Sequence, residues 1–193
     1  MRQLIVTEFV SLDGVMEAPG GEAGYAHSGW VADFFNDELG AYKQEEQLAA
    51  DILLLGRKTY GSFYGAWPSR DGAMADKINT MPKFVASTTL KALEWETARL
   101  LKLPVTAAVA ELKRGDGGAV LVVGSRTLVH TLLDAGLVDE LHLQVFPIIL
   151  GSGARLYPED PATTALTLAS STTLSTGVLL LSYNPIPGPQ TAR

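Results

Sequence analysis

The chain has 193 residues, which is enough for one domain with a substantial core. Its net charge of −6 argues against nucleic acid or an anionic membrane as the main partner. Because the sequence contains no cysteine, disulfides, thiolate metal sites and cysteine nucleophiles are excluded. The three histidines, His27, His130 and His142, lack the spacing of metal ligands, so no metal site is expected.

The sequence shows no sign of export or membrane insertion. No stretch approaches the ~20 apolar residues that a membrane-spanning helix needs. The N-terminal segment lacks the long apolar core and the small-residue cleavage site of a signal peptide. We therefore expect a cytoplasmic protein that acts on a small molecule and contacts neither a membrane nor nucleic acid.

The first predicted strand covers residues 3–10 and is followed by Asp13 and Gly14, a pair that favours a turn. An aspartate at the end of a central strand is also a candidate for substrate contact or proton donation. Residues 15–29 are rich in glycine and are predicted to form a long loop, of the kind that can cover a binding site. A loose connection is the alternative.

Apolar residues then recur at helical spacing from Trp30 to Ala50, which predicts one amphipathic helix over that range. Asp33 lies near its start. A negative charge at that place suits the helix dipole, which is the simplest explanation for it.

The next segment combines a strand, a glycine, and basic and hydroxyl residues. An apolar strand at 51–55 is followed by a short helix that opens with Gly56, Arg57, Lys58 and Thr59. A helix N-terminus presents unpaired N–H groups and the positive end of its dipole, which favours a bound phosphate. Arg57 is the residue type that accepts the 2′-phosphate of NADP, and Lys58 adds a point charge. A solvated basic turn is the alternative.

Residues 83–87 form a third predicted strand. The hydroxyl groups of Ser87 and Thr88 at its end can contact a nucleotide or simply cap a turn. Further on, Pro104 fits the first turn of a helix that ends with Gly115 as its C-cap.

A second arrangement of strand, glycine and helix follows. The apolar run 119–123 predicts a strand buried on both faces, and Gly124 ends it. Ser125 or Thr127 can cap the next helix, after which a strand with period-two alternation begins. This order predicts a parallel βαβ unit. With Arg126 also at its turn, the unit gives a second predicted phosphate-binding corner.

The remaining segments complete the predicted fold. Gly151 and Gly153 indicate a bend at which the backbone approaches another group closely. Residues 166–174 and 178–183 are predicted to pair as antiparallel strands. Residues 185–193 contain three prolines and are predicted to form a flexible tail.

Five short motifs resemble those of the RibD C-terminal, dihydrofolate-reductase-like superfamily, and the match extends over nearly the whole chain. They are Ser-Leu-Asp-Gly at 11–14, Leu-Gly-Arg-Lys-Thr-Tyr at 55–60, Val-Val-Gly-Ser at 122–125, Gly-Leu-Val-Asp-Glu-Leu at 136–141 and Pro-Ile-Ile-Leu-Gly-Ser-Gly at 147–153. The resemblance implies an α/β protein with a three-layer dihydrofolate-reductase-like fold. In that fold a mixed, mostly parallel central sheet is flanked by helices, and the C-terminal strand is antiparallel. It also implies a single domain over residues 1–184 and a homodimer.

The resemblance further implies NADPH as the cofactor, bound across the carboxyl ends of the strands. Gly56, Arg57, Lys58 and Thr59 would meet the adenosine-side phosphates, Ser87 and Thr88 would lie near the adenine ribose, and Gly124, Ser125, Arg126 and Thr127 would hold the pyrophosphate.

The implied activity is an NADPH-dependent reductase that transfers hydride to a small heterocyclic or imine-type substrate. One specific form is the 5-amino-6-(5-phosphoribosylamino)uracil reductase reaction of riboflavin biosynthesis, although residues 15–21 look more like those of stand-alone relatives. Asp13 is the expected substrate contact or proton donor, and Asp33 falls about where dihydrofolate reductase has its acidic residue. Dihydrofolate reduction and a non-catalytic nucleotide-binding module are the alternatives.

Overall fold

The computed structural model describes residues 1–102, 104–157, 159 and 163–186. Its described strands form one eight-stranded sheet with the order β4-β3-β2-β5-β1-β6-β8-β7. The strands are β1 (Leu4–Ser11), β2 (Ala50–Gly56), β3 (Lys83–Ala86), β4 (Ala98–Leu100), β5 (Ala119–Val123), β6 (Glu140–Phe146), β7 (Leu166–Thr173) and β8 (Leu179–Pro185). The helices are α1 (Asp37–Ala49), α2 (Arg57–Ala66), α3 (Ala73–Thr80), α4 (Val105–Arg114) and α5 (Arg126–Asp134). None of these described helices is both long and apolar enough to cross a membrane.

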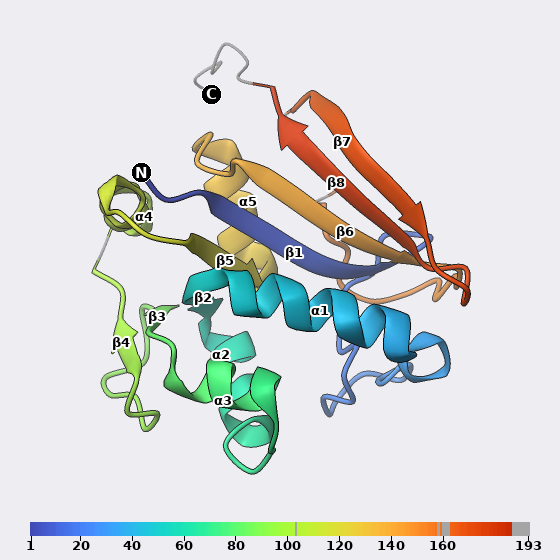
Figure 1. Cartoon of the computed structure of the whole chain (residues 1–193), viewed down its shortest axis with the longest axis horizontal. Coiled ribbons are helices and arrows are strands. Elements are labelled where there is room, and N and C mark those ends of the chain that lie inside the picture. The colour runs from blue at the N-terminus through green and yellow to red at the C-terminus, as the bar shows by residue number, and fades with distance from the viewer. Residues whose placement is uncertain (103, 158, 160–162, 187–193) are drawn as a thin grey trace.

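Six neighbouring strands of the sheet run parallel to one another, from β4 at one edge to β6. β8 pairs antiparallel with both β6 and β7, so its arrow points the opposite way in Figure 1. The predicted mixed, mostly parallel sheet with an antiparallel C-terminal strand is therefore confirmed. Since parallel strands end on the same side, the turns after β1, β2, β3 and β5 all lie along one edge, which is where α/β proteins bind ligands.

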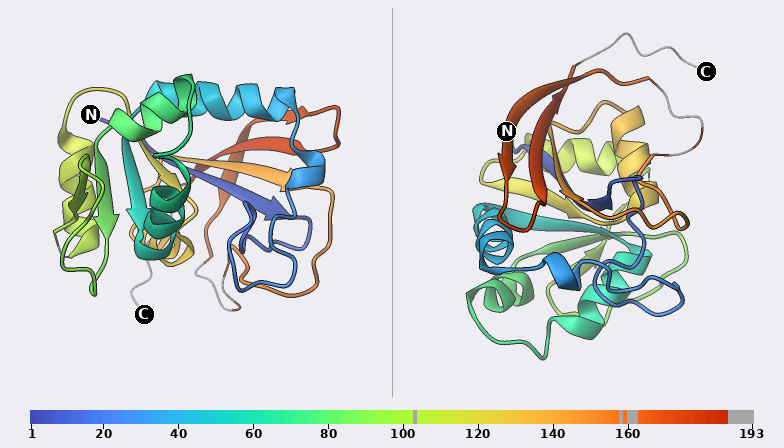
Figure 2. Two further views of the ribbon diagram at one scale, coloured as in Figure 1. Left: turned by 90° about the horizontal axis from the view of Figure 1, so that it is seen from below. Right: turned by 90° about the vertical axis from the view of Figure 1, so that its right-hand side faces the viewer.

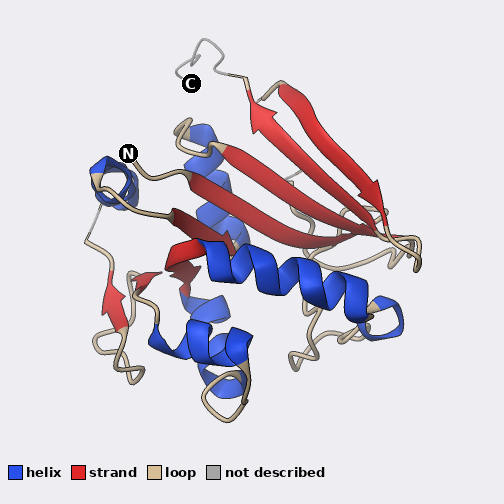
Figure 3. Cartoon of the chain, viewed as in Figure 1, coloured by secondary structure: helices blue, strands red, loops and turns tan. Residues whose placement is uncertain are grey.

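Helices cover both faces of this sheet and give the molecule three layers, as Figures 2 and 3 show. Leu54 of β2 joins Leu132 of α5 in a buried cluster on the side of α4 and α5. Its neighbour Leu53 joins Ile78 of α3 in a second cluster on the opposite face. Burial on both faces explains why residues 52–55 are apolar throughout rather than alternating.

The helix predicted from Trp30 to Ala50 is wrong at its start. A 3-10 turn, η1 (Ala32–Phe34), comes first, and Phe35 then takes an extended conformation with φ −82° and ψ 112°. α1 begins only after Asn36, whose side chain accepts a hydrogen bond from the N–H of Leu39 at 3.1 Å. Asparagine is a strong N-cap residue, and here the cap overrides a continuous apolar pattern.

Two other parts of the chain differ from the prediction or lie beyond it. The sequence pattern does not predict α3, in which only Ala75 and Ile78 are buried. Of the predicted tail at 185–193, Pro185 belongs to β8, and residues 187–193 lie outside the described residues.

Lys83 begins β3 with an exposed fraction of 0%. Its ammonium group donates hydrogen bonds to the carbonyl oxygens of Asn79 at 3.3 Å and Met81 at 2.8 Å, at the end of α3. A third bond goes to Thr97 Oγ1 at 2.8 Å, and the ring centroid of Trp95 is 4.1 Å away. Burial lowers the pKa of Lys83 to about 8, yet these contacts satisfy its donors and hold α3 against β3.

Candidate active site

The turns that follow β2 and β5 touch each other at the carboxyl edge of the sheet. The backbone N–H of Gly56 donates a hydrogen bond to Ser125 Oγ at 2.8 Å. The N–H of Ser125 donates in turn to Thr59 Oγ1 at 3.0 Å. The two predicted corners therefore form one feature, which we call the double corner and define as residues 56–59 and 124–127.

Glycine is required at position 124 by the geometry of the double corner. The φ angles of Gly124 (+55°) and Ser125 (+66°) both lie in the left-handed region, which L-residues other than glycine rarely adopt. A Cβ atom on residue 124 would lie 3.2 Å from Thr59 Oγ1 and 3.3 Å from Cγ2 of the same side chain. A larger residue would therefore require the Thr59 side chain to shift by a few tenths of an ångström.

Both helices of the double corner start without a side-chain cap. Gly56 precedes α2 and has no side chain to offer. Ser125 precedes α5, but its hydroxyl donates to the carbonyl oxygen of Val123 at 3.0 Å and does not accept from α5. The prediction that Ser125 or Thr127 caps this helix is wrong. Among the described residues, no acceptor pairs with the N–H groups at the start of either helix, which belong to Arg57, Lys58, Arg126 and Thr127, and the positive ends of two helix dipoles meet.

Basic side chains stand around the double corner. Arg57 and Lys58 are exposed and form no ion pair within the described part of the chain. Arg126 Nε donates to the carbonyl oxygen of Arg155 at 2.7 Å, a contact that leaves its positive charge uncompensated. N–H groups, helix dipoles and free positive charges together can hold a phosphate or pyrophosphate.

Ser87 and Thr88 follow β3 beside the double corner, because Ala86 of β3 pairs with Gly56 of β2. The Ser87 hydroxyl accepts a hydrogen bond from the N–H of Leu90 at 3.0 Å. This contact is the turn-capping role that the sequence gives as the alternative to nucleotide binding. Thr88 is exposed at the same edge of the sheet.

Asp13 lies just beyond the end of β1, where its carboxylate holds the loop that follows β6. Oδ1 accepts hydrogen bonds from Ser11 Oγ at 2.7 Å and from the N–H of Leu150 at 3.1 Å. Oδ2 accepts from the N–H of Gly151 at 2.9 Å. The bond from Ser11, supported by the two N–H groups, lowers the pKa of Asp13 to about 2. The carboxylate is therefore ionised at neutral pH, which suits loop positioning and gives no support to proton donation.

Asp33 lies in η1 on the exposed surface. It forms no hydrogen bond or ion pair with another described residue, and no described contact joins it to the double corner. Its neighbour Phe34 packs edge-on against Phe146 at the end of β6, with ring centroids 5.9 Å apart. Aromatic packing therefore fixes this turn, and the carboxylate of Asp33 takes no part in it.

The loop of residues 15–29 runs from the end of β1 toward α2. Figure 2 shows it beside the loop that follows β6, and backbone hydrogen bonds join the two loops. At its far side, Ser62 of α2 donates to Glu22 Oε1 at 3.0 Å. A Cβ atom on Gly153 would lie 2.8 Å from Tyr25 Oη, so the predicted close approach of the backbone at this glycine is confirmed.

Glu8 is a residue of this edge that the sequence analysis does not single out. It follows Thr7, which pairs with Val123 at the end of β5, so Glu8 stands beside Gly124. Its exposed fraction is 3%, and its Oε1 atom has no hydrogen-bond partner among the described residues. Burial raises the pKa of Glu8 well above its usual value, although the charge of Lys43 lowers it. The available signal was a single acidic residue inside a mostly apolar strand.

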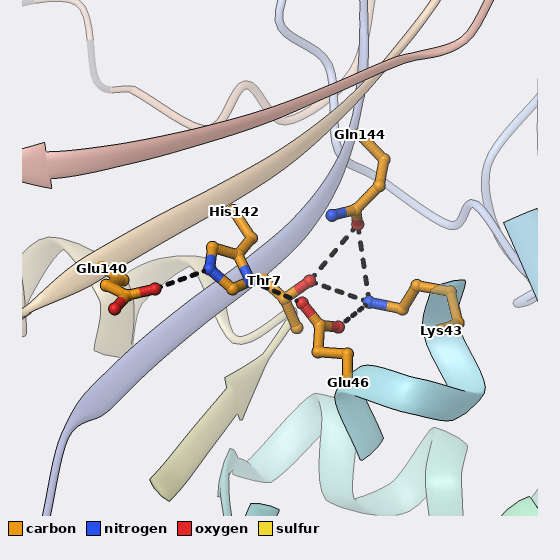
Figure 4. A network of polar contacts seen from close by, with 6 residues as sticks. All are labelled: Thr7, Lys43, Glu46, Glu140, His142 and Gln144. Carbon is orange, nitrogen blue, oxygen red and sulfur yellow. Dashed lines mark hydrogen bonds and ion pairs between the residues drawn. The ribbon is translucent and has the colours of Figure 1, made fainter. Parts of the chain in front are cut away.

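The opposite face of β1 carries a connected polar network, shown in Figure 4. Lys43 of α1 donates to Thr7 Oγ1 at 2.8 Å and forms an ion pair with Glu46. His142 of β6 lies between two carboxylates, with Nδ1 2.8 Å from Glu46 Oε1 and Nε2 3.0 Å from Glu140 Oε2. Burial lowers the pKa of His142, but the two carboxylates raise it by more, which favours the doubly protonated ring. The network ties α1 to β1 and β6.

Solved structures share this fold over nearly the whole chain. A Shewanella sp. PV-4 protein named for riboflavin biosynthesis has a TM-score of 0.75 at 21% identity, covering 96% of this chain and 99% of its own. A pyrimidine reductase-like protein from Corynebacterium diphtheriae has a TM-score of 0.69 at 14% identity, covering 97% and 93%. These likenesses show the fold, which is the α/β fold of RibD C-terminal, dihydrofolate-reductase-like proteins.

The sequence matches the RibD C-terminal domain family over residues 2–180, so the chain belongs to that family. This confirms the resemblance drawn from the five motifs. YyaP, an uncharacterized protein of Bacillus subtilis (strain 168), is 25% identical over 188 residues, which are 95% of each chain. YwjB of the same organism, also uncharacterized, is 25% identical over 170 residues, or 86% of this chain and 89% of its own.

We expect Asp13→Asn to loosen the loop after β6. The amide nitrogen cannot accept a hydrogen bond, so one loop N–H loses its partner and the free energy of unfolding falls by about 1–2 kcal/mol. Because the pKa of Asp13 is lowered, the stability it contributes is present above pH 3.8 and is lost as the pH falls toward about 2. Urea unfolding across this range and amide exchange at Gly151 measure both effects. Asp33→Asn is the control, and an equal loss there would contradict the assignment.

The network of Figure 4 predicts a second way in which the free energy of unfolding depends on pH. The pKa of His142 is raised in the folded protein. The stability that His142 contributes is therefore fully present below pH 6.5, its ordinary pKa, and is lost as the pH rises through the folded-state pKa. His142→Gln should remove this dependence and cost about 1.5–3 kcal/mol at pH 6, the range for hydrogen bonds to charged groups. Urea unfolding at pH 6 and pH 9 is the measurement. His27→Gln, at an exposed histidine, should keep the wild-type slope, and the same slope in both variants would refute the role of His142.

Proposed function

We propose that this protein is an NADPH-dependent reductase that transfers hydride to a small heterocyclic or imine-type substrate. The observation that carries the proposal is the double corner, where two uncapped helix N-termini meet through the bond between Gly56 and Ser125. A pyrophosphate is the ligand that such a surface favours. Membership of the RibD C-terminal domain family supports the same assignment.

Each part of the double corner has a role in this proposal. Residues 124–127 hold the pyrophosphate, chiefly through the N–H groups of Arg126 and Thr127 and the charge of Arg126. Arg57 and Lys58 take the adenosine-side phosphates, and Ser87 and Thr88 lie at the adenine ribose. NADPH, when bound, supplies the hydride, while these residues fix its position and the loop of residues 15–29 excludes water.

The substrate we propose to test first is 5-amino-6-(5-phosphoribosylamino)uracil. A Thermotoga maritima protein with this fold bears the name of that reductase, joined to the name of a deaminase. Its TM-score is 0.64 at 16% identity, and the match covers 96% of this chain but 57% of the Thermotoga chain. Dihydrofolate reduction has less support, because Asp33 is exposed and its carboxylate forms no hydrogen bond or ion pair with another described residue.

A measurement of NADPH oxidation distinguishes the proposed reductase from the two alternative functions, dihydrofolate reduction and a non-catalytic binding module. Oxidation of NADPH is followed by absorbance with 5-amino-6-(5-phosphoribosylamino)uracil and, separately, with dihydrofolate. Oxidation with the first compound supports the proposal, and oxidation with dihydrofolate alone supports the folate activity. Tight NADPH binding without oxidation in the presence of either compound, or of other imines, supports a non-catalytic binding module.

Arg57→Ala is expected to distinguish the two nicotinamide cofactors. If the guanidinium group holds the 2′-phosphate, its loss should weaken NADPH binding by about 1.5–3 kcal/mol, the range for charged hydrogen bonds. NADH has no 2′-phosphate, so its affinity should stay nearly unchanged. Fluorescence titration with both cofactors is the measurement.

The control for this titration is Arg114→Ala. Arg114 is exposed at the end of α4, which leads into the amino end of β5, away from the double corner. This variant should bind both cofactors like the wild type. Equal losses of NADPH and NADH affinity in Arg57→Ala would refute the assignment of the 2′-phosphate.

We also propose that two copies of the chain pair as a homodimer. β7 lies at an edge of the sheet, and its residues after Leu166 are exposed. An unpaired strand edge is a surface on which a second chain can add. Sedimentation at several protein concentrations would measure the mass, and a monomer throughout would contradict the proposal.

A further inference from the structure

Glu8 is a buried acid whose carboxyl group is only partly paired. Its exposed fraction is 3%, and its Oε1 atom lacks a hydrogen-bond partner among the described residues. Leaving a buried polar atom unpaired is unfavourable, and such atoms are rare in folded proteins. On the other face of the same strand, Glu46 pairs with both Lys43 and His142. The unpaired Oε1 atom of Glu8 is therefore a local exception.

The position of Glu8 places it at the double corner. Thr7 pairs with the last residue of β5, and the next residue along β1 therefore lies level with Gly124, whose backbone N–H interacts with the Glu8 carboxyl group. The neighbouring side chains of Val6 and Val10 join Leu128 of α5 in one cluster, so Glu8 faces the side on which α5 begins.

The surroundings of Glu8 keep its proton in place. Burial is the largest effect and raises the pKa of Glu8 well above its usual value. The negative charge of Glu46 raises it further, whereas the positive charge of Lys43 lowers it. Tyr157 also lies near Glu8, and because burial raises its pKa it is neutral at pH 7 and adds no charge. A neutral carboxylic acid can stand next to a bound pyrophosphate without repelling it.

We propose that Glu8 is the proton donor of the reaction, an inference that rests on the proposed reductase function. Glu8 gives its proton to the nitrogen of a substrate C=N bond, which a ribosylamine acquires when its sugar ring opens to the imine, while the carbon of that bond accepts hydride from NADPH. The π electron pair of the C=N bond becomes the new N–H bond, and the cofactor leaves as NADP⁺. Glu8 remains as a carboxylate and regains a proton from solvent after the product departs.

The first experiment locates the proton and does not depend on turnover. Infrared difference spectra of the wild type and of Glu8→Gln are compared at pH 7, with and without NADPH. We expect a protonated carboxyl band that is present in the wild type, shifts when NADPH binds and is missing in the variant. A wild type without this band, or a band that NADPH leaves unmoved, would overturn the inference.

The second experiment follows single-turnover hydride transfer with 5-amino-6-(5-phosphoribosylamino)uracil as the probe. Glu8→Gln keeps nearly the same shape but cannot act as an acid, so the rate should fall by about 10²–10⁴-fold, the usual contribution of a general acid. The wild-type rate should decline as the pH rises through the Glu8 titration, whereas the residual rate of the variant should be flat. The NADPH dissociation constant at pH 7 should change by less than about threefold, because the neutral amide replaces a neutral acid.

Two further variants control for folding and for loss of a buried carboxyl group. Glu8→Leu should unfold in urea at pH 8 no more easily than the wild type, since it removes an unpaired acid. Glu46→Gln, on the opposite face of β1, should lose stability because it breaks two ion pairs. The rate of hydride transfer should still decline as the pH rises, but at a slightly lower pH, because the charge of Glu46 raises the pKa of Glu8.

The outcomes separate this inference from the reductase proposal. A wild type that does not bind NADPH would overturn both. A wild type that binds NADPH and reduces the probe, with Glu8→Gln equal to it in rate and pH profile, would overturn the role of Glu8 and leave the reductase standing. If the probe is not reduced, the infrared experiment alone tests the role of Glu8. A carboxyl band that shifts when NADPH binds supports the role, and a band that does not shift overturns it.

Discussion

The hydrogen bond from the Gly56 N–H to Ser125 Oγ is the contact on which the rest of the site depends. It joins the start of α2 to the start of α5, although these helices pack on opposite faces of the sheet. The bond forms because the chain turns through a left-handed conformation at Gly124, where any side chain would press on Thr59. Two helix dipoles therefore converge on one point of the carboxyl edge, and this positive potential is what an anionic ligand needs.

β1 runs between two polar environments of opposite character. On the side of α1, the charges of Lys43, Glu46 and His142 compensate one another and connect a helix to two strands. On the side of α5, Glu8 is buried without a full set of partners. Compensated charges can be explained by folding alone. An uncompensated group lowers the stability of the fold, so its presence beside a ligand-binding corner is better explained by chemistry.

Much of the fold could be predicted because its signals are local. The apolar runs at β2 and β5, the glycines that end them and the alternation in β6 all reflect positions within a few residues. The helix around α1 was misjudged because Asn36 interrupts it through a single side-chain bond that periodicity does not record. α3 gave no usable pattern, since only two of its side chains are buried. Short elements with few core contacts depend on tertiary context.

The site shows the same division between local and long-range information. Glycine followed by basic and hydroxyl residues marked both halves of the double corner, but the contact between the halves joins residues 69 positions apart and left no trace in the sequence. The acids were harder to assign. Asp13 receives hydrogen bonds from Ser11 and from two N–H groups of a distant loop, which keep it ionised, while burial raises the pKa of Glu8 and favours its neutral form. Residue type and spacing cannot reveal this contrast, because it arises from groups brought in by β5, β6 and α1. Two carboxyl groups near one strand end whose environments move their pKa values in opposite directions have different roles, and only the neutral one has a proton to give.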